Sequence, residues 1–299
     1  MNISLRKQYN PYINGEFIPY SGITFQAVNP ATGEVLTKIA RCGQSEVESA
    51  VIAARNAFLT WKETSYEERA RLLNRLADEL EKNLQRLALI DATDVGRRLA
   101  EVRLDYEKAI AQYRYFAAAI STYEGYGKPI PDGYMVAKRE PIGVIGQIIP
   151  WNVPALMVAL KVAPAIAAGN TVILKPDENA SISTLEFAAV AGEILPPGVI
   201  NVVPGFGDEV GNAITTHPLV SKLAFTGSPE VGRLIGHAAA ERLIPASLEL
   251  GGKSPNMGLE IRGFSTGRRS CGLLLEEWVR RFQCGVYQSR YERRISDNV

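Results

Sequence analysis

The chain has 299 residues, of which 46% are hydrophobic and 22% are charged, with 33 basic against 32 acidic side chains. This composition is typical of a globular protein long enough to form one or two domain cores. A formal net charge of +1 argues against nucleic acid as a partner, because binding to the phosphate backbone needs a surplus of basic residues. No run of 18 apolar residues is present, so the sequence predicts no membrane-spanning helix.

The N-terminal sequence and the numbers of cysteines and histidines predict where the protein is located in the cell and whether it binds a metal ion. The first fifteen residues, MNISLRKQYNPYING, lack the apolar stretch of a signal peptide. Cys42, Cys271 and Cys284 are too few and too scattered for a disulfide framework or a zinc site, and the two histidines, His217 and His237, cannot build a histidine-rich metal centre. We therefore expect a cytoplasmic protein without a bound metal.

Helices are predicted first along the chain. Ser45 with Glu48, and Ser65 with Glu68, have the spacing of a capping box at a helix start. Apolar residues at helical spacing follow each of them, and a third helix is predicted over about residues 97–122. The apolar stripes consist of Val47, Val51, Phe58 and Trp61 after the first start, and Leu72, Leu73, Leu76, Leu80, Leu84 and Leu87 after the second. The Gly- and Pro-rich residues 126–138 predict a strand pair or an extended arm.

From residue 142 onward, strands and helices alternate. Short apolar runs predict strands at residues 142–149, 171–175, 199–203, 222–227 and 246–250, and helical patterns at 153–168, 182–194, 209–216 and 229–240 separate them. This order predicts an α/β fold with a doubly wound parallel sheet. The carboxyl ends of such strands share one edge, where ligands bind.

Several polar or glycine-containing clusters follow the predicted strands. Gly205, Gly207 and Gly211 are typical either of a phosphate-binding loop or of an ordinary tight turn. Gly227 and Ser228 open a helix whose free N–H groups suit a pyrophosphate, although Ser228 alone also fits a simple N-cap.

Lys175 and Glu178 lie three residues apart at the end of the second strand. Such a pair can hold ribose hydroxyls, or it can be a solvated ion pair. An acidic residue at this place disfavours a 2′-phosphate, so the pair favours NAD over NADP.

Asn152 and Glu249 are the candidate catalytic residues. The Asn152 amide follows the first strand and can donate a hydrogen bond to a carbonyl oxygen, or it can stabilise a turn. Glu249 precedes two glycines at the end of the fifth strand and is either a general base or an exposed carboxylate.

Taken together, these segments resemble a known family. QIIPWNVP, GNTVILKP, GVINVVPGFG, KLAFTGSPEVG and LELGGKSPN, preceded by YINGEFI and NPATGEVL, resemble the NAD(P)-dependent aldehyde dehydrogenase superfamily over residues 12–257. The resemblance implies a Rossmann-like nucleotide-binding domain preceded by a helical N-terminal region. It also implies a reaction in which a cysteine thiolate attacks an aldehyde, a hydride passes to NAD, and a glutamate activates the water that hydrolyses the thioester.

The resemblance assigns roles residue by residue. Asn152 would supply an oxyanion donor, Glu249 would be the general base, and Lys175 and Glu178 would hold the adenosine ribose. The other groove residues would be Ile148, Pro150, Trp151, Gly207, Gly211, Phe225, Gly227, Ser228 and Val231, with Leu250 near the nicotinamide. The implied cofactor is NAD rather than NADP, and the implied substrate is an aldehyde. The implied assembly is a homo-oligomer, dimer or tetramer, held by an arm over about residues 123–141.

The residues after Met257 depart from this pattern. Residues 258–299 contain eight arginines and no lysine, which suits a basic partner-binding arm or the product of an altered reading frame. The family nucleophile lies in a GQxC motif that would fall in the low 280s, near Cys284, but RRFQCGVYQSR does not reproduce it. Two functions therefore remain open: NAD-dependent oxidation of an aldehyde, or a catalytically inactive, truncated nucleotide-binding fragment.

Overall fold

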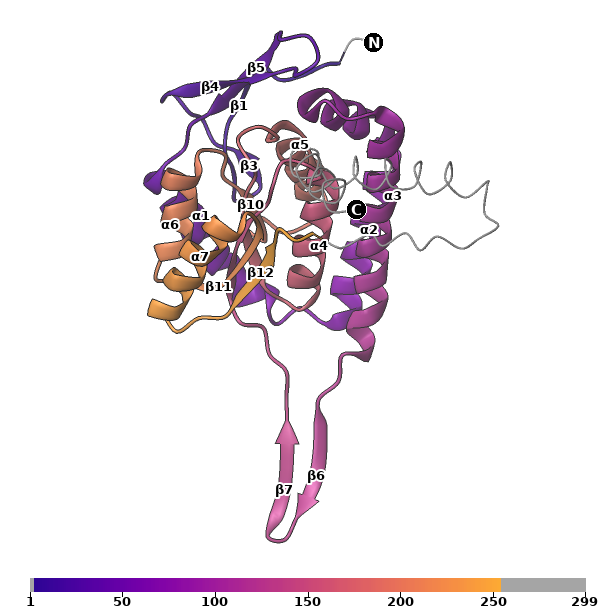
Figure 1. Cartoon of the computed structure of the whole chain (residues 1–299). Coiled ribbons are helices and arrows are strands. Elements are labelled where there is room, and N and C mark those ends of the chain that lie inside the picture. The colour runs from indigo at the N-terminus through magenta and orange to yellow at the C-terminus, as the bar shows by residue number, and fades with distance from the viewer. Residues whose placement is uncertain (1–2, 254–299) are drawn as a thin grey trace, which may run out of the picture. The chain divides into compact units, whose positions relative to one another are not determined.

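The computed structural model describes residues 3–253, all but the last two of which belong to the first of two units, Met1–Gly251. A seven-stranded sheet of order β12-β11-β8-β9-β10-β2-β3 forms the centre of the first unit (Figure 1). Five strands run parallel and two short strands add antiparallel at one edge, which confirms the predicted doubly wound sheet. The parallel strands are β8 (Val144–Ile148), β9 (Thr171–Lys175), β10 (Ile200–Val202), β11 (Val220–Gly227) and β12 (Ala246–Leu250), and the antiparallel ones are β2 (Tyr12–Ile13) and β3 (Glu16–Phe17).

Helices cover both faces of this sheet (Figure 1). One face is covered by α4 (Pro154–Ala167) and α5 (Ile182–Gly192), and the long antiparallel pair α2 (Tyr66–Val95) and α3 (Leu99–Ala119) packs outside them. The other face carries α1 (Gln44–Trp61), α6 (Asn212–Thr216) and α7 (Pro229–Glu241). Because both faces are covered, the central strands β8 and β9 are almost wholly buried and read as continuous apolar runs. None of the helices within residues 3–253 has the length and hydropathy that crossing a bilayer requires.

The strand order reverses at β8. From β8 the chain moves outward through β9 to β10, then returns to place β11 on the other side of β8, and β12 follows beyond it. The connection to β11 contains a short π-helical turn, η2 (Gly207–Gly211), ahead of α6. A doubly wound sheet opens a crevice beside the carboxyl ends of its strands where the order reverses, so a ligand is expected to bind between β8 and β11.

The first helix begins differently from the prediction. Ser65 caps α2 as expected, since its Oγ accepts a hydrogen bond from the Glu68 N–H at 3.3 Å. The Ser45–Glu48 capping box is wrong. The N-cap of α1 is Gly43, whose N–H donates to Glu46 Oε2 at 2.8 Å. Glu48 lies two residues further along α1 and instead contacts His217 Nε2 at 2.9 Å.

Strands also precede the predicted helical region. A second sheet, of order β1-β5-β4, is built from β1 (Gln8–Tyr9), β4 (Thr24–Val28) and β5 (Val35–Ala40). No strand was predicted in this part of the chain, where three strands, β1, β2 and β3, span only two residues each. Such short segments have no detectable alternation of apolar and polar residues.

The Gly- and Pro-rich segment forms the predicted strand pair. After a single 3-10 turn, η1 (Ile120–Thr122), strands β6 (Tyr126–Ile130) and β7 (Gly133–Ala137) pair in an antiparallel hairpin. The hairpin projects away from the body of the unit and is almost fully exposed (Figure 1). It leaves the body at the amino end of β8, opposite the edge where ligands are expected.

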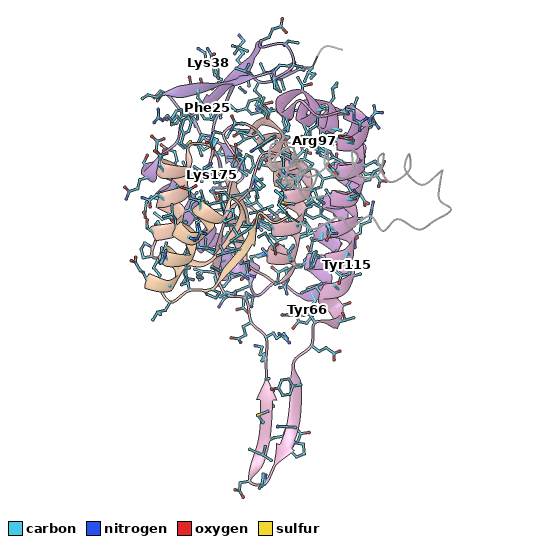
Figure 2. All side chains as sticks on the ribbon, in the orientation of Figure 1. Phe25, Lys38, Tyr66, Arg97, Tyr115 and Lys175 are labelled. Atoms are coloured by element: carbon cyan, nitrogen blue, oxygen red, sulfur yellow. The ribbon has the colours of Figure 1, made fainter. Side chains whose placement is uncertain are left out.

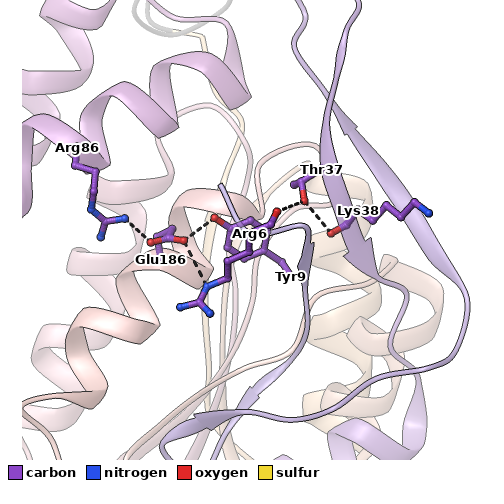
Figure 3. A network of polar contacts seen from close by, with 6 residues as sticks. All are labelled: Arg6, Tyr9, Thr37, Lys38, Arg86 and Glu186. Atoms are coloured by element: carbon purple, nitrogen blue, oxygen red, sulfur yellow. Dashed lines mark hydrogen bonds and ion pairs between the residues drawn. The ribbon is translucent and has the colours of Figure 1, made fainter. Parts of the chain in front are cut away.

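A buried carboxylate fastens the N-terminal segment to the sheet domain (Figure 3). Glu186, on α5, is buried, and its Oε1 accepts a hydrogen bond from Tyr9 Oη at 2.5 Å. Arg86 Nη1 donates to Glu186 Oε2 at 2.5 Å, and Arg6 Nε lies 3.7 Å from Oε1. A buried charge is tolerated only when it is paired and hydrogen-bonded, so these three partners compensate the desolvation of Glu186.

We predict opposite outcomes for two buried tyrosines. Replacing Tyr9 by Phe removes a hydrogen bond to a charged acceptor and should lower the free energy of unfolding by about 1–2 kcal/mol. Tyr113 is equally buried, but its Oη has no hydrogen-bond partner within the described residues, so Tyr113→Phe should be neutral or stabilising. Urea unfolding of both variants and the parent chain measures this. Equal losses in the two variants would contradict the assigned role of Glu186.

Candidate functional site

The register of the parallel strands aligns the predicted site residues at one edge. Ile148, the last residue of β8, pairs with Lys175 on one side and with Phe225 on the other. On the outer pair of strands, Gly227 of β11 is in register with Leu250 of β12. The candidate residues after β8, β9, β11 and β12 therefore come from neighbouring strand ends, as the sequence analysis expected.

Lys175 occupies the centre of this edge (Figure 2). Its side chain is buried, and its Nζ donates to the Pro176 carbonyl oxygen at 2.9 Å and to Glu178 Oε2 at 3.2 Å. The Glu178 carboxylate is about one third exposed, so it reaches solvent while its partner does not. The pair is therefore not a solvated ion pair. The two charged groups hold each other in place at the end of β9.

Gly211 lies beside this ion pair. A Cβ placed on Gly211 would stand 3.8 Å from Ile148 Cδ1 and 3.9 Å from Lys175 Cδ, which are ordinary van der Waals distances. The three residues thus converge from β8, β9 and the η2 turn. Packing alone does not require glycine at this position.

Among the glycines after β10, Gly205 is the one whose backbone conformation requires glycine. Its φ is +147°, and a Cβ there would stand 2.9 Å from the Cys42 carbonyl oxygen. Gly207 has no heavy atom within 4 Å of its Cβ position. The tight-turn interpretation therefore fits Gly205, whereas Gly207 leaves open space above the turn.

At the start of α7, Ser228 acts as an N-cap. Its Oγ accepts from the Val231 N–H at 3.2 Å, and its carbonyl oxygen accepts from the Gly232 N–H at 2.9 Å. Behind it, the Phe225 ring packs across the face of Gly227, where a side chain would overlap it. The Ser228 hydroxyl and carbonyl oxygens thus already accept hydrogen bonds from two amides in the first turn of α7.

Asn152 lies in the loop that joins β8 to α4, together with Pro150 and the partly exposed Trp151. Its Oδ1 is buried and has no hydrogen-bond partner among residues 3–253. A buried polar atom without a partner is costly, and in native proteins it calls for an explanation such as a bound ligand. The structure thus gives no support to a turn-stabilising role for this side chain.

Glu249 is exposed on β12 and aligns with Thr226 of β11. Its charge acts on Lys161 of α4, a residue that was not among the predicted site residues. Burial lowers the pKa of Lys161 to about 8, the Glu249 carboxylate opposes this shift, and Lys222 adds to it. In the sequence, Lys161 stands out as a charged residue within an otherwise apolar helix, but the sequence does not show that it lies near Glu249.

The remaining reactive groups are the cysteine thiols and the side chains that could bind a metal ion. Cys42 is buried, and burial raises the pKa of its thiol, so it is a poor nucleophile. Cys284 and the Arg-rich residues 258–299 lie outside the described residues. Within residues 3–253, no group of three His, Cys, Asp or Glu side chains is arranged to hold a metal ion.

The family of the chain follows from its similarity to known proteins. Residues 17–260 match the profile of the aldehyde dehydrogenase family. The chain belongs to the aldehyde dehydrogenase family. An aldehyde dehydrogenase of Vibrio cholerae serotype O1 is 45% identical over 258 residues, which cover 85% of this chain and 51% of that protein. Acetaldehyde dehydrogenase 2 of Cupriavidus necator is 46% identical over the same shares of each chain.

Solved structures agree with this assignment. The NAD⁺ complex of an aldehyde dehydrogenase from Bacillus cereus is 40% identical, with a TM-score of 0.83 over 87% of this chain and 56% of that one. The Rossmann-like aldehyde dehydrogenase fold is therefore confirmed. This aldehyde dehydrogenase chain spans about half the length of the curated relatives it matches.

The glycines of the turn after β10 give a test of the site. Gly205→Ala should lower the free energy of unfolding by about 1–3 kcal/mol, because alanine is strained at this φ and its methyl group meets the Cys42 carbonyl. Gly207→Ala in the same turn should leave stability unchanged, since the methyl group enters open space. Thermal or urea unfolding of the two variants distinguishes them, and an equal loss at Gly207 would show that the turn needs both glycines.

Proposed function

We propose that this chain supplies the dinucleotide-binding half of an NAD-dependent oxidation of an aldehyde to a carboxylic acid. The observation that carries the proposal is the convergence, at one sheet edge, of the buried Lys175–Glu178 pair, the open space over Gly207 and the unpartnered Asn152 Oδ1. The relatives named for aldehydes and the NAD⁺ complex of the Bacillus cereus protein support it.

The residues present fit a nicotinamide dinucleotide. Lys175 and Glu178 would hold the adenosine ribose from two sides, because one offers a fixed donor and the other a fixed acceptor. The acidic Glu178 favours NAD over NADP, since a 2′-phosphate would meet its negative charge. The groove itself would be lined by Ile148, Pro150, Trp151, Asn152, Gly207, Gly211, Phe225, Gly227, Ser228, Val231 and Leu250. When bound, NAD accepts a hydride from the substrate.

Two residues would act on the aldehyde. The Asn152 amide would donate a hydrogen bond to the oxygen on which negative charge develops. The Glu249 carboxylate would take a proton from the attacking water.

A second candidate function follows from the thiol chemistry. Within residues 3–253 the thiol is that of Cys42, which is buried and has a raised pKa. A chain without an activated thiolate would bind NAD but would not form the thioester. The alternative is therefore a catalytically inactive nucleotide-binding fragment, and turnover separates it from the first proposal.

We predict that the 299-residue chain binds NAD, and that Lys175→Met weakens binding at least tenfold, because it removes a charged donor beside the ribose. Glu178→Gln should narrow the preference for NAD over NADP. Isothermal titration with each dinucleotide measures both effects, with Lys38→Met, on the separate N-terminal sheet, as the matched control.

Adding acetaldehyde and following NADH absorbance decides between the two functions. NADH formation that depends on the aldehyde supports the oxidation. NAD binding without turnover supports the inactive fragment. No binding of either dinucleotide contradicts both.

The β6–β7 hairpin is proposed as the oligomerisation arm. It exposes Tyr126, Tyr134 and Val136 on a ribbon that packs against no other element of the described unit, and an isolated two-stranded ribbon is marginally stable in water. Replacing residues 126–137 by a short Gly-Ser linker should therefore convert a homo-oligomer to a monomer. Light scattering of both chains measures the change, and an unchanged molar mass would show that assembly uses another surface.

A further inference from the structure

Two buried carboxyl groups extend from the last turns of α2. Asp91 is 1% exposed and Asp94 is 4% exposed, so both are removed from solvent. Asp94 Oδ2 accepts a hydrogen bond from the backbone N–H of Ile182 at 3.0 Å. The Asp91 carboxyl group lies next to the backbone of Ala155, which lowers its pKa, while its Oδ1 has no partner within the described residues. Each carboxyl group thus contacts the first turn of a helix that covers the sheet.

These two helices lack caps of their own. Val153, at the N-cap of α4, has no side chain able to cap, and Ser181, at the N-cap of α5, instead donates its hydroxyl to the Asp177 carbonyl oxygen at 2.8 Å. A helix start leaves backbone N–H groups without partners, and acidic side chains there are stabilising. The acceptors that α4 and α5 lack locally are therefore supplied by α2.

Both helix starts adjoin the candidate dinucleotide site. Asn152 is two residues before Pro154, the first residue of α4. Glu178 is four residues before Ile182, the first residue of α5. Because the loops are this short, a shift of either helix start moves the site residue that precedes it.

We propose that Asp91 and Asp94 are positioning residues that hold the two loops of the dinucleotide site at the distance NAD binding requires. The inference rests on the proposed function. It assigns a role in the site to a helix that contributes no residue to the crevice. Asp91 fixes the loop that carries Asn152, and Asp94 fixes the loop that carries Glu178.

The surroundings of the pair determine its charge. The charges of Asp94 and Arg97 act on Asp91, and Arg97 also forms an ion pair with Asp105 of α3 at 2.6 Å. Tyr106 of α3 also lies next to Asp91, while α4 and α5 present the Ala155 and Ile182 amides.

Burial raises the pKa of both Asp91 and Asp94 to about 7, with the Asp94 charge adding to the shift at Asp91. Since these folded-state values lie above the ordinary aspartate pKa, the folded chain binds more protons than the unfolded chain between about pH 4 and 7. The contribution of the pair to stability is thus present at low pH and is lost as the pH rises through 7.

The positioning role predicts the opposite trend for binding. Ionised carboxylates hold helix N–H groups more strongly than neutral ones, so NAD affinity should increase from pH 6 to 8 while stability decreases. A merely structural role would make affinity follow stability.

The test compares Asp94→Ala, Asp94→Asn and the control Asp78→Ala, an exposed aspartate on the same helix. NAD binding is measured by isothermal titration at pH 6, 7 and 8, and stability by urea unfolding. Asp94→Ala should weaken NAD binding about fivefold at pH 8, the equivalent of one lost helix cap. Asp94→Asn keeps an acceptor but does not titrate, so it should restore most of the affinity and reduce the pH dependence. Binding by Asp94→Ala that equals the parent at every pH overturns the proposal.

Hydrogen exchange at the backbone amides keeps this test separate from the proposed function. If the parent chain binds no NAD, the proposed function fails, but Asp94→Ala should still accelerate exchange at Ile182 and in residues 176–181. Unchanged exchange there overturns the positioning role. If Asp94→Ala does not fold, the same comparison between the parent and Asp94→Asn, at pH 6 and 8, decides the question.

Discussion

The parallel pairing of β8 with both β9 and β11 is the constraint on which the candidate site depends. Ile148 is in register with Lys175 on one side and Phe225 on the other, so a slip of either strand would separate residues that now share one edge. Side chains alternate between the faces of a sheet, and a slip by one residue would turn Lys175 away from Gly211 to the opposite face. The register therefore determines which residues can meet a ligand.

Buried charge connects parts of the chain that are distant in sequence. Glu186 links α5 to the N-terminal strand through Tyr9 and to α2 through Arg86. Asp94 links α2 to the first turn of α5 through Ile182. Each contact satisfies a group that would be costly to bury alone, and together they fix α5 at both its start and its middle. The helix that follows Lys175 and Glu178 is thereby held by polar contacts as well as by apolar packing.

Much of this organisation could be predicted from local patterns. The alternation of apolar runs and helical stripes predicted the parallel sheet, and the bounds of β9 and β12 follow their apolar runs residue for residue. The cap at Gly43 was missed because glycine has no side chain to signal it, and the contact is made by Glu46 reaching back. The neighbours of Lys161 and Asp94 were missed because contacts between distant segments leave no periodic trace in the sequence.

The position of β12 has a consequence for how the chain behaves in solution. It is the last strand of the sheet, it pairs only with β11 among the strands of residues 3–253, and most of its residues are exposed. Within residues 3–253 no strand pairs with the outer side of β12, and such an edge is the geometry from which one molecule extends its sheet into another. Self-association of this chain would then start from a folded molecule at β12, and the charge of Glu249 is the feature of that strand that opposes it.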